Sequence, residues 1–159
     1  MLIKHRIIII STLLFLFIIL VLTSNASAFQ WRYKQSKEKL TDKQYSSAWS
    51  YAFDYKYNND FTVSFVCSGG KVRFNIDADT LITSKGKPFP FAYRVDKRDT
   101  QNITMRAFSN NNQGGYTYNN VDEIAKSILG GNKMFVRTTT WNNEYLEANI
   151  SLVGSDSAI

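Results

Sequence analysis

The feature that most constrains the fold of this chain is an alternation of apolar and polar residues with a period of two. The segments 61–67 (FTVSFVC) and 72–76 (VRFNI) both show it, and Gly69–Gly70 lies between them. Successive side chains of a β-strand point to opposite faces of a sheet, so the pattern is typical of strands with one buried face. Two such runs joined by a glycine turn predict a β-hairpin.

Similar patterns predict further strands at 45–57, 91–96, 103–109, 134–140 and 145–153. Proline has no N–H to donate to a neighbouring strand, so Pro88 and Pro90 are expected to confine their stretch to a loop or a sheet edge. Asn110–Gly115 is expected to be a polar loop. Short strands and turns therefore account for most of the chain.

One segment has the period of a helix instead. Its apolar residues fall at positions 121, 124, 125, 128 and 129, which form a single stripe on an α-helix. Asn120 is expected to cap its start, and Gly130–Gly131 to end it. The chain is thus predicted to be mostly β, an antiparallel β-sandwich or sheet of about eight strands with one short helix near the C-terminal end.

The segment 45–57 is distinctive because its aromatic residues all fall on odd positions. They are Tyr45, Trp49, Tyr51, Phe53, Tyr55 and Tyr57. A strand places them on one face, and we expect that face to belong to the core. A partly exposed recognition edge is the alternative, because tyrosine is common at interfaces.

The first 28 residues have the composition of a secretory signal peptide. Met1–Arg6 is positively charged, Ile7–Leu22 is apolar, and Ala26-Ser27-Ala28 offers a cleavage site. As a helix the apolar run would rise about 24 Å, which is short of the roughly 30 Å hydrocarbon core of a bilayer. We therefore expect cleavage after Ala28, a periplasmic or secreted location, and one folded domain over residues 29–159; a retained membrane anchor is the alternative.

Loss of the leader changes the chemistry available to the chain. It removes the only histidine, His5, and of 19 basic residues it removes Lys4 and Arg6, which leaves 17 against 13 acidic ones. The remaining single cysteine, Cys67, is expected on the buried face of its strand. Without histidine or a second cysteine, Ser-His-Asp and Cys-His catalysis, histidine-ligated metals and an internal disulfide are excluded. We expect no cofactor, no metal and, since the basic residues form no dense run, no nucleic-acid partner.

Charged side chains in the predicted strands and turns supply the remaining candidates. Arg94, Arg106 and Arg137 fall in strands, and a face carrying them suits an anionic polymer or a protein partner, because guanidinium groups bind carboxylates and phosphates. The alternatives are ordinary solvated positions or an ion pair of Arg94 with Asp96. The carboxylate pairs of a possible glycosidase, at 77 and 79 or at 96 and 99, fall where turns normally carry solvated charge.

Several short motifs occur in an order that indicates a family. They are Trp31 with Ser36 and Leu40-Thr41-Asp42, Phe61–Cys67 with Ser68, Tyr93-Arg94-Val95-Asp96, Met134–Thr140 and Ala148–Gly154. Together they resemble the periplasmic domain of the type VI secretion accessory family known as TagO or VasI, over nearly all of the mature chain. Val66 departs from the usual arginine of that family, and Met105 and Phe108 stand in a strand where it commonly has a tryptophan.

The resemblance implies a β-rich, non-catalytic periplasmic module that assists an envelope machine. We expect it to bind an envelope protein or a cell-wall component through a sheet face or strand edge, with membrane contact only if the leader is retained. The alternatives are an inhibitor of a lysozyme-like hydrolase, presenting Asn110–Gly115 or Trp141–Glu144 to the enzyme, and a carboxylate-dependent hydrolase. The candidate binding residues are Arg94, Asp96, Arg106, Arg137, Trp141 and Tyr145.

Overall fold

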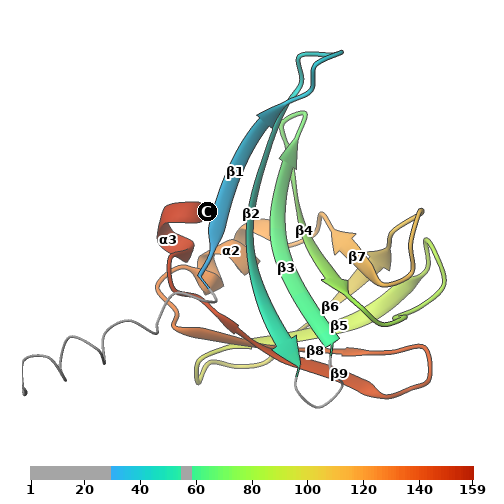
Figure 1. Cartoon of the computed structure of the whole chain (residues 1–159). Coiled ribbons are helices and arrows are strands. Elements are labelled where there is room, and N and C mark those ends of the chain that lie inside the picture. The colour runs from blue at the N-terminus through green and yellow to red at the C-terminus, as the bar shows by residue number, and fades with distance from the viewer. Residues whose placement is uncertain (1–29, 55–58) are drawn as a thin grey trace, which may run out of the picture.

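A computed structural model of the chain describes residues 30–54 and 59–159, which form one open antiparallel sheet of nine strands and two short helices (Figure 1). The strands are β1 (Arg32–Lys37), β2 (Gln44–Asp54), β3 (Asn59–Ser68), β4 (Lys71–Ala78), β5 (Pro88–Val95), β6 (Gln101–Ala107), β7 (Gly114–Thr117), β8 (Lys133–Thr139) and β9 (Tyr145–Ser151). The helices are α2 (Val121–Ile128) and α3 (Ser155–Ala158). The mostly β class is therefore confirmed; the predicted leader, Tyr55 and Tyr57 lie outside the described residues.

The sheet bends so that its two ends approach each other. Its strand order is β1-β2-β3-β4-β7-β6-β5-β8-β9, and in Figure 1 β1–β4 stand upright while β5, β6, β8 and β9 cross beneath them. The Ser50 hydroxyl of β2 donates to the Ser151 carbonyl of β9 at 3.2 Å. Just before β1, the Trp31 backbone N–H donates to the Val153 carbonyl at 3.1 Å. The bend encloses an apolar core between the two halves of the sheet.

Aromatic residues run through this core from one half of the sheet to the other. The ring centroids of Phe65 and Phe74 are 5.2 Å apart, and those of Phe74 and Phe91 are 5.9 Å apart. Burial of each such side chain contributes about 1.5–3 kcal/mol to folding. The apolar stripe of α2 closes the core with two fully buried isoleucines. In the part of the chain that the structure describes, neither helix is long and apolar enough to cross a membrane.

The predicted hairpin and helix are both present. β3 and β4 pair through Ser68 and Lys71, with Gly69 and Gly70 at φ +57° and +76°, the conformation that a tight hairpin turn requires. α2 begins at Val121 as expected and is followed by Gly130 at φ +71°. The predicted side-chain cap at Asn120 is wrong: this residue is itself left-handed and accepts the Ile124 N–H through its backbone carbonyl.

The prediction that the odd-numbered aromatics of β2 belong to the core is wrong for Tyr45, Trp49 and Tyr51. These side chains are half-buried on the outer face, and the core-facing positions are Ala48, Ser50 and Ala52. The register explains the reversal, since Ala48 pairs with Phe65 and Ala52 with Phe61. Small residues on β2 leave room for the large side chains of β3. Cys67 is on the core-facing side of β3, as expected, but is only half-buried.

Two segments, one expected in a loop or at a sheet edge and one expected as a loop, contribute residues to strands. Pro88 and Pro90 belong to β5, which lies between β6 and β8. β8 pairs only with Phe91–Val95, so the prolines occupy the part of β5 where no ladder with β8 needs their N–H. The expected loop Asn110–Gly115 ends early, because β7 begins at Gly114 and bridges β4 and β6.

Candidate binding face

An arginine and three aromatic residues gather on the outer face of β4, β6 and β7. Phe74 and Ile76 of β4 point into the core, so Arg73 points outward. Its guanidinium carbon lies 5.5 Å from the centroid of the Tyr116 ring and 5.9 Å from that of Phe108. We call the group of Arg73, Phe108, Tyr116 and Tyr118 the aromatic–arginine cluster.

The rings of this cluster also contact one another. Phe108 and Tyr116 are stacked with centroids 5.8 Å apart, and Tyr118 meets Tyr116 edge-on at 5.5 Å. Tyr118 is 53% exposed, so the cluster extends from the sheet to the solvent. Contacts between a cation and a ring contribute about 0.5–1 kcal/mol when exposed and about 2 kcal/mol when desolvated. The cluster is thus a preformed surface of flat rings around a fixed positive charge.

Two buried polar atoms, one in the cluster and one next to it, have no hydrogen-bond partner in residues 30–54 and 59–159. They are Nε of Arg73 and Oδ1 of Asn75, and Asn75 is only 5% exposed although it lies on the outer face. Asn75 pairs across the ladder with Tyr116, which places it directly next to the cluster. An unpaired buried polar group costs about 1–3 kcal/mol, so stability alone does not explain this arrangement.

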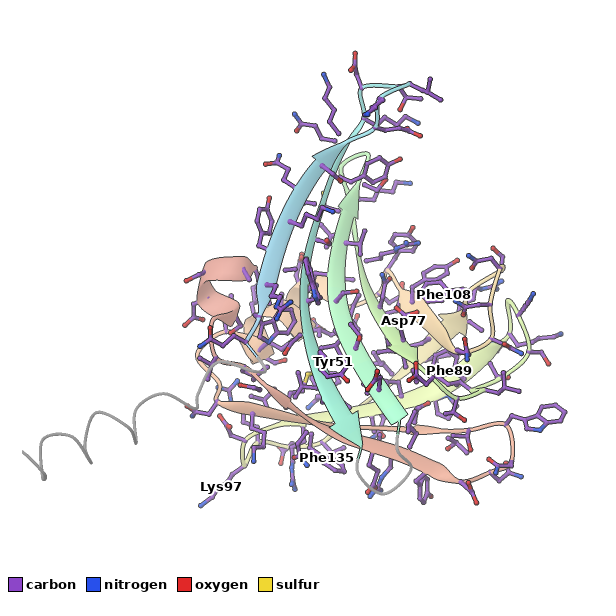
Figure 2. All side chains as sticks on the ribbon, in the orientation of Figure 1. Tyr51, Asp77, Phe89, Lys97, Phe108 and Phe135 are labelled. Carbon is purple, nitrogen blue, oxygen red and sulfur yellow. The ribbon has the colours of Figure 1, made fainter. Side chains whose placement is uncertain are left out.

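Asp77 adds a carboxylate with unusual acidity to the same face of β4. Figure 2 shows it near Phe108, where β7 approaches β4. Asp77 is exposed, although one of its carboxylate oxygens lies 2.9 Å from the point where a side chain on Gly114 would begin. Partial burial of this carboxylate against β7 raises the pKa of Asp77 from 3.8 to about 6, and the positive charge of Arg73 opposes the rise. Asp77 was expected in a turn with solvated charge; it is exposed, but it lies within β4 and not in a turn.

Replacing Asp77 with asparagine is expected to stabilise the protein above pH 6. Between pH 4 and pH 6 the folded state holds a proton that the unfolded state releases, so the native aspartate makes stability fall as the pH rises through this window. The rise in the pKa of Asp77 corresponds to about 3 kcal/mol, and solvent screening at an exposed carboxylate reduces the expected gain to about 1 kcal/mol.

Urea unfolding of both proteins at pH 4 and pH 7 checks this expectation. The difference between them should vanish near pH 4 and be complete at pH 7. A stability difference that is the same at both pH values would contradict the assigned environment of Asp77.

Three of the candidate residues from the sequence lie together on the outer face of β5, β8 and β9: Arg94, Arg137 and Tyr145. Arg94 pairs with Phe135 in the ladder, and the guanidinium carbon of Arg137 lies 4.8 Å from the Tyr145 ring centroid. However, Arg137 also forms an ion pair with Glu147, with 2.5 Å between Nη2 and Oε1. Its charge is therefore largely neutralised within this face, unlike that of Arg73, which forms no ion pair within the part of the chain described.

The carboxylate of Asp96 is hydrogen-bonded to the protein backbone. Its carboxylate accepts the backbone N–H groups of Asn132 at 3.1 Å and Lys133 at 3.0 Å, and these bonds lower its pKa. Its φ of +50° is left-handed, which aspartate tolerates better than most residues. Asp96 thus attaches the turn after β5 to the start of β8. No ion pair links it to Arg94 in the described structure, so that expected alternative is wrong.

The last two candidates are Arg106 and Trp141. Arg106 pairs with Tyr116 across β6 and β7, so it borders the aromatic–arginine cluster and lies away from Arg94 and Arg137. Trp141 follows β8 and is 71% exposed, while its backbone N–H donates to the Leu81 carbonyl at 3.0 Å. All three arginines are exposed positions of the one sheet, but Arg106 lies beside the aromatic–arginine cluster and not beside Arg94 and Arg137.

Analysis of the sequence did not identify the aromatic–arginine cluster. Arg73, Asn75 and Asp77 are the polar half of the alternation that predicts β4, and that was the available signal. Over residues 30–54 and 59–159, no three histidine, cysteine or acidic side chains are grouped so that they could hold a metal ion. Comparisons of the chain with protein-family models, curated proteins and solved structures found no match.

Proposed function

We propose that this chain is an exported, non-enzymatic binding domain that holds a protein or cell-wall partner of the bacterial envelope through its aromatic–arginine cluster. The observation that carries the proposal is the packing of the Arg73 guanidinium against both Phe108 and Tyr116 on a face that the core does not use. Tyrosine, phenylalanine and arginine are enriched at protein interfaces, and tyrosine and arginine dominate their binding energy.

Two further points favour this face over the Arg137 side. Arg73 has an unpaired Nε and no acidic ion-pair partner in the described residues, whereas Arg137 is engaged by Glu147. Rings that are already packed lose little conformational freedom on binding, so preformed aromatic surfaces bind with a smaller entropic cost. The resemblance to the TagO/VasI accessory family agrees with a partner in an envelope machine, and the signal-peptide pattern agrees with export.

Affinity capture from periplasmic extract, followed by mass spectrometry, tests the proposal. The baits are the wild-type protein and its Tyr118→Ala, Tyr145→Ala and Trp141→Ala variants, all at exposed positions. Tyr145 is the matched control because it also packs on an arginine. We expect Tyr118→Ala to weaken capture of a specific envelope partner by about tenfold or more, as is common for an interface tyrosine, and the other two to retain it.

The outcomes separate the proposal from its rivals. Recovery of a muramidase alone, lost on Trp141→Ala but retained on Tyr118→Ala, would favour an inhibitor that works through a loop. Substrate turnover by the purified protein that one aspartate-to-asparagine change abolishes, without loss of fold, would establish a hydrolase. Equal capture by wild-type protein and Tyr118→Ala would refute the assignment of the cluster.

A further inference from the structure

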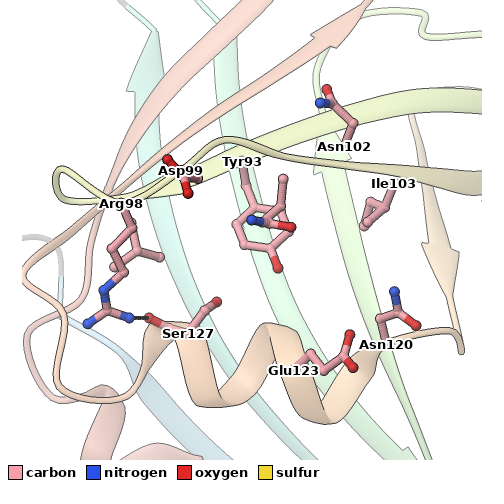
Figure 3. Close-up of a pocket in the computed structure, with 10 residues that line it drawn as sticks. Tyr93, Arg98, Asp99, Asn102, Ile103, Asn120, Glu123 and Ser127 are labelled. Carbon is pink, nitrogen blue, oxygen red and sulfur yellow. Dashed lines mark hydrogen bonds between the residues drawn. The ribbon is translucent and has the colours of Figure 1, made fainter.

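A cavity of about 320 Å³ lies between α2 and the hairpin of β5 and β6 (Figure 3). Its size is in the range of sites for small molecules. Tyr93 of β5 forms the floor: the residue is 5% exposed, and Figure 3 shows its hydroxyl pointing toward α2, between Ser127 and Glu123. The cavity shares no lining residue with the aromatic–arginine cluster.

The charges around the cavity are unbalanced. Glu123 on α2 and Asp99 in the hairpin turn contribute two carboxylates, and Arg98 contributes the one positive charge. Arg98 already donates from Nη1 to the Ser127 carbonyl at 2.8 Å, at the end of α2. Within the described residues no hydrogen bond or ion pair engages the carboxylate of Glu123 or of Asp99. The lining of the cavity therefore has a net negative charge, and its one arginine is hydrogen-bonded to the end of α2.

The floor of the cavity stays neutral and able to hydrogen-bond. Burial, the larger effect, and the negative charge of Glu123 raise the pKa of Tyr93, while a hydrogen bond with the Ser127 side chain lowers it. Glu123 and Tyr93 both line the cavity. Asn102 and Asn120 add carboxamides to the lining, and the half-buried Ile103 adds an apolar wall.

We propose that this cavity binds a small organic molecule that carries a primary ammonium group together with hydroxyl or amide groups. The free carboxylate of Glu123 suits the ammonium group, because hydrogen bonds between charged partners are the strongest that side chains form. The phenol and the carboxamides provide donors and acceptors for the rest of the molecule. Two sources share this chemistry, an amino sugar and a lysine-like side chain of a peptide.

Titration of the isotope-labelled protein, followed by amide NMR shifts, tests the proposal with defined probes. The charged probes are glucosamine and Nα-acetyl-lysine methylamide, and the neutral controls are the same compounds with the amine acetylated. We expect the charged probes to shift amides of α2 and of the β5–β6 turn. We expect the acetylated probes to bind at least about tenfold more weakly. The tighter of the two charged probes identifies the source.

Matched variants complete the test. Glu123→Gln is expected to raise the Kd of the charged probe about tenfold, whereas Glu144→Gln, the same change in the β8–β9 turn, should leave it within about twofold. Both glutamates are exposed, so both variants should fold. Equal binding of charged and acetylated probes, equal effects of the two variants, or no shift in α2 would each overturn the proposal. Because Tyr118 lies outside the cavity, failure here leaves the proposed function intact, and the reverse also holds.

Discussion

Replacing Trp31 with alanine is expected to lower the free energy of unfolding by about 3–5 kcal/mol. The indole is 6% exposed, and its ring centroid lies 6.0 Å from that of Phe65. Its backbone N–H donates to the Val153 carbonyl, so the residue joins the start of β1 to the segment after β9, where the bent sheet closes. Domains of this size have a total stability of about 5–15 kcal/mol, so the loss would be a large share of it.

Trp31→Phe is the matched control for this prediction. The indole Nε1–H is buried and has no hydrogen-bond partner in the described residues. Phenylalanine keeps an aromatic ring and removes this unpaired donor, so we expect a loss of less than about 1.5 kcal/mol. Urea unfolding followed by circular dichroism measures both variants. If phenylalanine destabilised the protein as much as alanine, the packing of the ring would not be the cause.

Gly115→Ala is expected to destabilise the protein by about 3 kcal/mol. A methyl group there would begin 2.4 Å from the Arg106 carbonyl oxygen and 2.5 Å from a ring carbon of Phe89. Backbone atoms of β6 cannot rotate away, so β7 must shift. Tyr116, the next residue, would move with it, and capture of the envelope partner should fall together with stability.

A second glycine separates steric crowding from backbone strain. Gly70→Ala places a methyl group in open space, but at φ +76°, which alanine adopts at a cost of about 1–2 kcal/mol. We therefore expect a smaller loss than at Gly115 and unchanged partner capture. Thermal unfolding and the capture assay provide the two measurements. Equal losses at the two positions would indicate that contact with β6 does not set the cost at Gly115.

Local signals predicted the elements that short-range physics determines. The β3–β4 hairpin follows from alternation around Gly69–Gly70, and α2 follows from its apolar stripe and the glycine after it. The buried face of β2 could not be found in this way. Its aromatic side is more hydrophobic by composition, but pairing of Ala48 with Phe65 turns the small residues inward. Long-range register, which the sequence of β2 does not contain, decides the outcome.

The candidate site shows the same limit. Arg94, Arg106 and Arg137 were expected on one face; Arg94 and Arg137 lie on neighbouring strands, whereas Arg106 pairs with Tyr116 beside the aromatic–arginine cluster. Arg73 was missed because its cluster depends on β7, whose Gly-Gly-Tyr-Thr sequence reads as a continuation of the polar loop before it. Asp96 was selected from a motif, yet its carboxylate is directed at backbone N–H groups. Side-chain partners distant in the sequence determined all three outcomes.

The contact between Trp31 and Val153 has a mechanical consequence. Trp31 directly precedes β1 and Val153 lies between β9 and α3, so the two ends of the described structure lie close together (Figure 1). Tension applied between them would act on this junction before it reached the strand ladders. The interior of the sheet would therefore keep its shape under loads that had already separated the ends.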